Sequence, residues 1–245
     1  EWSPEEKLEL ERYCEKILKN AAEEEMTPKE RFYATMRGKE KDRLHIEVKY
    51  NAPYAVRTLD GWADAVKPGD TYKRPKLHVK AHLATAARYK LDIINVYTIS
   101  YVENFFGGNA RMIDYGTPMV LGEPPLKTLE DMEDIEVPDP KKHGIYPGYL
   151  WAVREIQRVL AQYGADKVMP IEVSYCGGPL GQSMMTGGMM SMPNFMKAVR
   201  KEPEVAKRCM ELASQWSIKF GKAVKELNPD GMYLCCLLYT SPSPR

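Results

Sequence analysis

The feature that most constrains the fold of this chain is a repeated alternation between short apolar strand candidates and longer amphipathic helices. Strand patterns occur at residues 44–50, 92–97, 168–173 and 232–236. Apolar residues at helical spacing occur between them, at 75–90, 147–163, 193–200 and 203–227. Because helical crossovers join parallel strands, this order predicts an α/β fold with a parallel sheet covered by helices.

The number of strand candidates leaves two architectures open. A closed (β/α)8 barrel needs eight strands, so the pattern fits either a small open sheet or part of a barrel. The intervening stretch 105–147 is rich in Pro and Gly and is expected to be irregular, with one helical turn at 129–132. Residues 51–74 and the Gly- and Met-rich residues 176–191 are expected to be loops.

Two helix starts near the N-terminus carry complete capping signals. Ser3 and Thr27 are each followed by Pro and then, three residues after the cap, by Glu. This is the arrangement of a capping box with proline in the first turn. Residues 1–25 are therefore expected to form a solvated packing helix that extends the main domain.

Composition excludes several classes of protein. The chain carries 35 Lys and Arg against 34 Asp and Glu, so it has no bulk attraction to nucleic acid or anionic membranes. No apolar run approaches the roughly 18 residues of a membrane helix, and the acidic N-terminus is not a secretory signal. Five Cys without a CxxC pair favour a cytoplasmic protein. His78 and His82 share a helix face, where partial burial is favoured over metal binding.

Motifs in four places occur in an order that resembles one protein family. They are Met26–Arg31 with Met36–Arg43, Leu126–Asp131 with Val137–Pro140, Gly177–Leu180, and Lys201–Val205 with Asn228–Gly231. This succession resembles the uroporphyrinogen-decarboxylase superfamily over residues 26–236. The resemblance implies a (β/α)8 TIM barrel of roughly 340–380 residues.

A barrel of that size is longer than this chain. The chain is therefore expected to be a truncated barrel that contains about the first half to two-thirds of the fold. The domains are then an N-terminal helical extension at 1–25, a partial barrel at 26–236 and a non-native tail at 237–245. The tail contains Ser-Pro-Ser-Pro, which does not continue a strand because Pro removes a ladder donor. A genuine flexible terminus is the alternative.

Departures from the decarboxylase pattern favour the methyltransferase branch of this superfamily. True decarboxylases carry a first-strand segment RQAGRY, whose arginines meet substrate carboxylates; here residues 49–54 read KYNAPY. The family's catalytic Asp and active-site Tyr fall near Thr98 and Met185. The resemblance then implies an enzyme that moves a methyl group between a corrinoid (methylcobamide) and a thiol or other acceptor. The alternatives are tetrapyrrole decarboxylation in porphyrin biosynthesis, and a non-catalytic scaffold for a corrinoid protein.

The methyltransferase branch implies a zinc ion that binds and deprotonates a thiol. Its ligands, a His-x-Cys pair and a later Cys, are expected beyond Cys236, so no metal ligand is assigned in this chain. Cys235 and Cys236 point to opposite faces of a strand and are interpreted as small buried residues. The expected partners are a small-molecule methyl acceptor or tetrapyrrole and a corrinoid carrier protein, with neither nucleic acid nor membrane.

In a barrel, chemistry lies at the carboxyl ends of the strands and in the loops that follow them. Two acids at such positions are candidate catalytic residues, Glu103 and Glu172. The candidate substrate-binding residues lie at the same strand ends: Glu47, Tyr50, Asn51, Tyr97, Ser100, Tyr175, Gly177, Gly178, Met184 and Met185. Simpler alternatives stay open, namely a surface charge at Glu47, a loop ion pair at Glu103, a tight turn at the glycines and core packing of the methionines.

Overall fold

A computed structural model describes residues 1–48, 55–59, 74–97, 105–108, 110–111, 119–120, 123–175, 178–184 and 189–234. Its helices are α1 (Pro4–Ala22), α2 (Pro28–Met36), α5 (Pro75–Tyr89), α7 (Tyr146–Gln162), α8 (Pro179–Met184), α9 (Met192–Lys201) and α10 (Pro203–Lys225). Single 3-10 turns are η1 (Val56–Thr58), η3 (Glu130–Met132) and η4 (Ala165–Lys167). Its strands are β1 (Ile94–Tyr97), β2 (Ala110–Arg111), β3 (Met119–Val120), β4 (Ile171–Tyr175) and β5 (Gly231–Leu234).

The central sheet has three strands in the order β1-β4-β5, and both pairings are parallel. The register aligns Asn95 with Glu172 and Glu172 with Gly231. Strands β2 and β3 form a separate antiparallel pair within the stretch expected to be irregular. The predicted α/β class with a parallel sheet is therefore confirmed.

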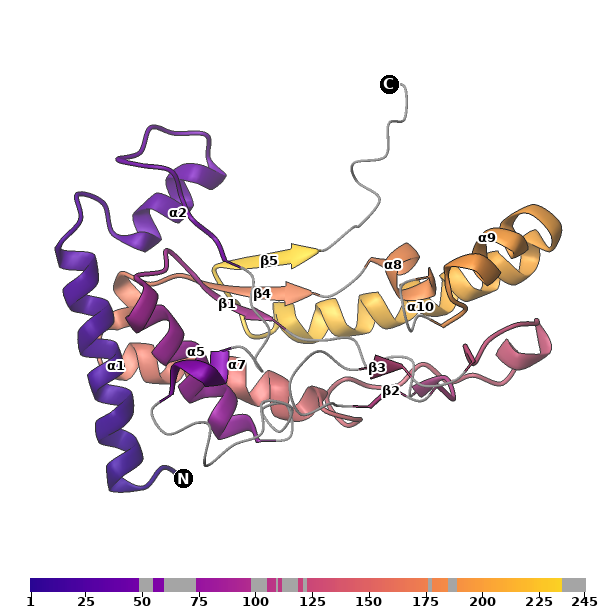
Figure 1. The fold of residues 1–245 in the computed structure, drawn as a ribbon, viewed down its shortest axis with the longest axis horizontal. Helices are drawn as coiled ribbons and strands as arrows, with labels where there is room; N and C mark the ends of the chain where they lie inside the picture. The colour runs from indigo at the N-terminus through magenta and orange to yellow at the C-terminus, as the bar shows by residue number, and fades with distance from the viewer. Residues whose placement is uncertain are drawn as a thin grey trace.

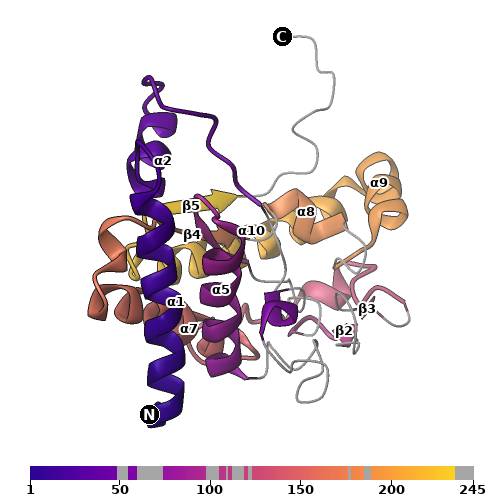
Figure 2. The same cartoon turned by 60° about the vertical axis from the view of Figure 1, so that its left-hand side comes forward.

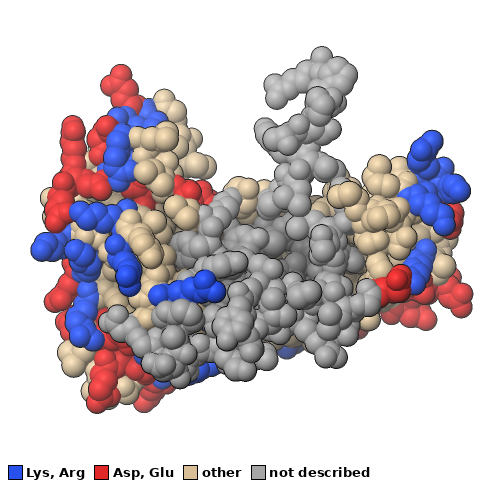
Figure 3. Space-filling model, viewed as in Figure 1, with Lys and Arg blue, Asp and Glu red and all other residues tan. Residues whose placement is uncertain are grey.

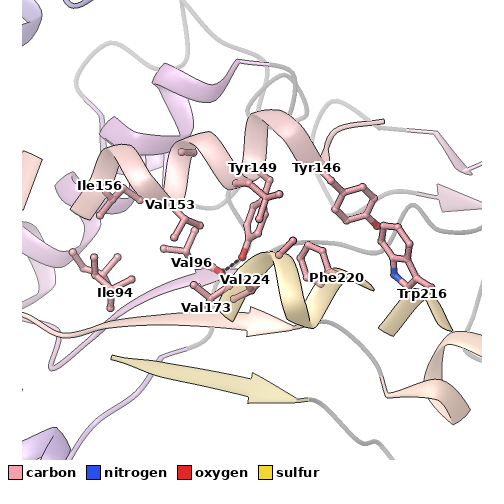
Figure 4. Packing of buried hydrophobic residues seen from close by; sticks show 14 of the residues in the cluster. Ile94, Val96, Tyr146, Tyr149, Val153, Ile156, Val173, Trp216, Phe220 and Val224 are labelled. Atoms are coloured by element: carbon pink, nitrogen blue, oxygen red, sulfur yellow. Dashed lines mark hydrogen bonds between the residues drawn. The ribbon is translucent and has the colours of Figure 1, made fainter. Parts of the chain in front are cut away.

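Helices α5, α7 and α10 cover one face of this sheet, below the strands in Figure 1. Alternate strand residues point towards these helices, and Ile94, Val96 and Val173 are fully buried or nearly so among them. Figure 4 shows these three side chains beside Ile156 of α7 and Val224 of α10. The intervening residues of each strand consequently face the opposite side, where the candidate site lies.

Aromatic rings extend this core beyond the sheet. Tyr146 of α7 meets Trp216 and Phe220 of α10 with ring centroids 4.8 and 5.4 Å apart, both in edge-on geometry. Such pairs are favourable beyond the apolar area they bury. Tyr149 donates a hydrogen bond of 2.7 Å from its hydroxyl to the carbonyl oxygen of Val96, which fixes α7 to β1 (Figure 4).

Helix α1 packs against α5 on the outer side of the domain, and the two helices run side by side in Figure 2. The capping box predicted at Ser3 is present. The carboxylate of Glu6, in the first turn of α1, forms ion pairs with Lys76 and Lys80 of α5, at Nζ–O distances of 3.0 and 3.3 Å. At the other end of α1, Asn20 donates a hydrogen bond to the carbonyl oxygen of Ala87. The expected packing helix is therefore present, with polar contacts to α5 at both of its ends.

Two secondary-structure predictions are wrong. Residues 44–48 form no strand: the Ile46 amide donates to the Asp92 carboxylate at 2.8 Å and not to a neighbouring strand. Their apolar side chains Leu44, Ile46 and Val48 are exposed, whereas Glu47 is half-buried. Within the stretch expected to be a loop, residues 179–184 form α8, and Pro179 stands at its first position, where a missing amide hydrogen costs nothing.

Across the described helices, none combines the length and the apolar character that a membrane crossing requires.

Candidate functional site

Three polar side chains meet on the sheet face opposite the helices. The Asn95 amide nitrogen lies 2.9 Å from Glu47 Oε1 and 2.5 Å from Glu172 Oε2, so one amide group donates to two carboxylates. Asn95 has no exposed surface and Glu172 is 8% exposed. The alternation of the strands fixes this arrangement, because Asn95 and Glu172 are register partners on neighbouring strands.

This cluster, Glu47–Asn95–Glu172, lies nearer the amino ends of the strands than predicted. Both Asn95 and Glu172 are the second residues of their strands, and β4 continues to Tyr175. At about 3.3 Å per residue, Glu172 lies roughly 10 Å below the carboxyl end of β4. The prediction that Glu172 stands at a strand end is wrong, because the strand begins and ends later than its apolar residues indicate. We call this cluster, which carries two carboxylates on the sheet face opposite the helices, the acidic floor.

Gly231 supplies the space beside Glu172. A Cβ at this position would lie 3.0 Å from Cζ of Phe32 and 3.4 Å from Cγ of Glu172. The Phe32 ring is only 4% exposed, so it has little room to yield. The glycine is therefore required by packing at the register position next to Glu172.

Gly231→Ala is expected to lower the free energy of unfolding by about 1–3 kcal/mol, because it overpacks a buried site. The matched control is Gly221→Ala in α10, where a Cβ would meet nothing within 4 Å. There the substitution should raise stability by about 0.5–1 kcal/mol through helix propensity. Urea denaturation of both variants measures this contrast, and equal effects at the two glycines would refute the packing argument.

A buried ion network lies at the amino end of β1. Arg31 has no exposed surface and contacts Asp42 at 2.6 Å, Asp92 at 2.5 Å and Glu24. Arg43 adds contacts of 2.7 Å to Asp92 and 2.8 Å to Glu24. Two guanidinium groups are thus held by three carboxylates, which leaves neither arginine available to an anionic ligand without breaking this network.

The network shifts the titration of its acids. Hydrogen bonds from Arg31 hold the pKa of Asp42 far below its usual range. Burial alone raises the pKa of Asp92, but hydrogen bonds from Arg43 and the Ile46 amide outweigh it and lower that pKa overall. Both carboxylates therefore remain charged at neutral pH, where they are ion-paired with the two arginines.

The described residues do not form a metal site. No group of three or more His, Cys, Asp or Glu side chains within them is arranged to hold a metal ion. His78 and His82 stack with ring centroids 4.7 Å apart, and both are buried, as expected from their shared helix face. Burial lowers the pKa of His78 to about 4 and that of His82 well below its usual value, so both rings are neutral.

Neither buried cysteine is an activated nucleophile. Burial raises the pKa of the Cys14 thiol to about 12 and that of the Cys209 thiol to about 11. The thiolate is the reactive form of cysteine. Both thiols are protonated at neutral pH and act as small core residues.

The sequence therefore identified two of the three cluster residues. Glu47 and Glu172 are brought together, and the interpretation of Glu47 as a surface charge is wrong. Asn95 was missed because it lies inside an apolar run, Ile94–Tyr97, that reads as core strand. Its polar side chain at a strand position facing away from the helices was the available signal.

For the remaining predicted site residues, the structure describes few side-chain contacts or none. Gly178 is buried directly before α8. Tyr97, Tyr175 and Met184 have described backbones at the ends of β1, β4 and α8. Outside the described residues lie Glu103, Tyr50, Asn51, Ser100, Gly177 and Met185, together with Cys235 and Cys236. Of the methionines interpreted as core packing, Met189 and Met190 are core residues, at 0% and 1% exposure, whereas Met192 is 51% exposed.

These features define an α/β protein in which a parallel sheet, helix-covered on one face, presents an acidic floor on the other. Residues 27–234 match the family described as uroporphyrinogen decarboxylase (URO-D), and the chain belongs to that family. The family fold is a TIM barrel, in agreement with the parallel α/β arrangement seen here. The sequence resemblance is thus confirmed.

Among solved structures, the chain is similar to a methyltransferase from Methanosarcina mazei, with a TM-score of 0.67 and 22% sequence identity. The match covers 86% of this chain and 59% of the other, so the chain spans less than two-thirds of that protein's length. At this identity the likeness establishes the shared fold. No curated protein sequence matches the chain significantly.

Proposed function

We propose that this protein is a methyltransferase of the URO-D family that moves a methyl group from a methylated corrinoid to a thiol acceptor. The observation that carries the proposal is the acidic floor, in which Glu47 and Glu172 share the amide of Asn95. The similarity in fold to a methyltransferase from Methanosarcina mazei supports the same reaction class.

The charge of the floor argues against the other main activity of the family. Uroporphyrinogen carries many carboxylates, and its recognition calls for available arginines or lysines. Here the cluster itself contains two carboxylates, Glu47 and Glu172, and Arg31 and Arg43 are committed to Asp42, Asp92 and Glu24. Like charges brought together in a partly buried site repel strongly. A neutral thiol and a corrinoid ring meet no such repulsion.

Methyl transfer to a thiol releases a proton, and the floor offers a base for it. The corrinoid, when bound, supplies the methyl group and keeps the electron pair of the broken cobalt–carbon bond. Sulfur forms the new bond to carbon as the thiol proton leaves. We assign that proton to Glu172 Oε1, while the Asn95 amide donates to Oε2 and holds the carboxylate in place. The zinc ligands implied by the family resemblance are expected beyond Cys236, and no group of three or more His, Cys, Asp or Glu among the described residues could hold a metal ion.

The test is an anaerobic assay with methylcobalamin as the methyl donor and 2-mercaptoethanol as the acceptor. The protein is expected to accelerate the loss of the methylcobalamin absorbance and to yield the methyl thioether in equal amount. Metal analysis of the same preparation reports whether zinc copurifies. Unaccelerated demethylation at every thiol concentration would reject the proposed reaction.

A further inference from the structure

Both glutamates of the acidic floor directly follow an isoleucine whose amide is bound by an aspartate from a distant part of the chain. The Ile46 amide donates to Asp92 Oδ2 at 2.8 Å, and the Ile171 amide donates to Asp230 Oδ2 at 3.0 Å. The next residue in the chain is in each case a glutamate of the floor. The backbone beside each glutamate is therefore fixed by a carboxylate.

The two aspartates occupy equivalent places in the sheet. Asp92 lies two residues before β1, and Asp230 lies directly before β5. Each carboxylate thus reaches from the start of its own strand to a neighbouring segment. A hydrogen bond from an amide to a carboxylate is charge-assisted and stronger than one to a neutral carbonyl. The same local arrangement therefore occurs twice, once beside each floor glutamate.

Helix α2 supplies a cation to each aspartate. Arg31 contacts Asp92 Oδ1 at 2.5 Å, and Lys29 contacts Asp230 Oδ1 at 2.9 Å. The Tyr33 hydroxyl donates to the same Oδ1 of Asp230 at 2.7 Å. One oxygen of each carboxylate is thus bound by α2, while the other accepts the amide. We call each set of an α2 cation, an aspartate and an amide a clamp: Arg31–Asp92–Ile46 and Lys29–Asp230–Ile171.

Helix α2 is itself held in place at its start. The capping box at Thr27 is present. The backbone amide of Lys29 donates to the carbonyl oxygen of Val168 at 2.8 Å, and its Nζ donates to that of Asp166 at 2.9 Å. Both carbonyls belong to the segment that leads into β4, and Figure 1 shows α2 towards the amino ends of the strands. The helix can therefore serve as a fixed support for both clamps.

Charges at this end of the molecule are paired with one another. Figure 3 shows cations and anions interspersed on its left-hand side, where Figure 1 places α1 and α2. In the second clamp, the side chains of Lys29 and Asp230 are 27% and 16% exposed. Each clamp combines a cation with an anion. The clamps consequently act by fixing positions, and not by attracting a charged ligand.

We propose that α2 positions the acidic floor through the two clamps, so that Asp92 and Asp230 are positioning residues for the methyl transfer. The inference rests on the proposed function, in which Glu172 accepts the thiol proton. Asp230 holds the amide that precedes Glu172, and this fixes the base next to Asn95, its register partner. A displacement of about 1 Å in a reacting group can cost about 100-fold in rate.

The Lys29–Asp230–Ile171 clamp offers the cleaner test, because Asp230 lies outside the buried ion network. Asp230→Ala removes the acceptor of the Ile171 amide. In the methylcobalamin assay, its kcat should fall about 10–100-fold, while its KM for 2-mercaptoethanol should stay within about 3-fold of the wild type. Hydrogen exchange at the Ile171 amide should become faster. Asp230→Asn keeps an oxygen for this amide and should recover most of the lost kcat.

Asp131→Ala is the matched control. Asp131 also accepts two backbone amides, from Lys127 and Thr128 at 2.8 and 2.7 Å, but it belongs to η3 and not to the sheet. Its kcat should equal that of the wild type, and circular dichroism checks that each variant is folded. A folded Asp230→Ala with wild-type kcat would overturn the positioning role and leave the proposed function standing, as would an equal loss of kcat in Asp230→Asn. A wild type that transfers no methyl group would refute the proposed function and this inference with it.

Discussion

Replacing Arg31 with methionine is expected to lower the free energy of unfolding by about 3–5 kcal/mol, the typical cost of removing one partner from a buried ion pair. The guanidinium is fully buried and holds Asp42, Asp92 and Glu24 together. Methionine fills similar space but leaves Asp92, itself 1% exposed, with Arg43 as its one remaining cationic partner among the residues that the structure describes. Urea denaturation followed by circular dichroism measures the loss.

The control for this variant is Arg12→Met on α1, where the arginine is exposed. A surface substitution of this kind should stay within about 0.5 kcal/mol of the wild type. If Arg31→Met were as stable as Arg12→Met, the network would contribute nothing to the fold, and the arginine would be available for a ligand.

Glu172→Gln is expected to reduce the rate of methyl transfer by about 10²–10⁴-fold, the usual contribution of a positioned acid or base. Glutamine keeps the shape of the side chain and an oxygen that accepts from Asn95, so the fold should be retained. It does not accept the thiol proton. The assay compares kcat for the two proteins.

Glu211→Gln is the matched control, since Glu211 is exposed on α10 and pairs only loosely with Arg208. Its rate should equal that of the wild type. If Glu172→Gln folds normally and its rate is unchanged, the acidic floor takes no part in the reaction and has only a structural role.

The parts of the fold set by local chemistry were predictable from the sequence. The capping boxes at Ser3 and Thr27 and the apolar spacing of α7 and α10 mark these helices within one or two residues. The 44–50 segment was mispredicted because its alternation is that of a strand, whereas a distant carboxylate, Asp92, takes its Ile46 amide. Such a competitor is not visible in the local pattern.

The site was predictable only in part, for a related reason. Glu47 and Glu172 were found because acids near predicted strand ends are conspicuous, but the amide that joins them is not. Arg31 reads as an ordinary helical surface residue, since its burial depends on Asp92, which lies far away in the sequence. Contacts between distant segments decided both cases.

We propose that the acidic floor suits methyl transfer and disfavours a polycarboxylate substrate. It is tested most directly by supplying one enzyme preparation in parallel with methylcobalamin plus thiol and with uroporphyrinogen. We expect catalysed formation of methyl thioether, its loss in Glu172→Gln, and no release of carbon dioxide from uroporphyrinogen. Catalysed decarboxylation of uroporphyrinogen without methyl transfer would contradict it.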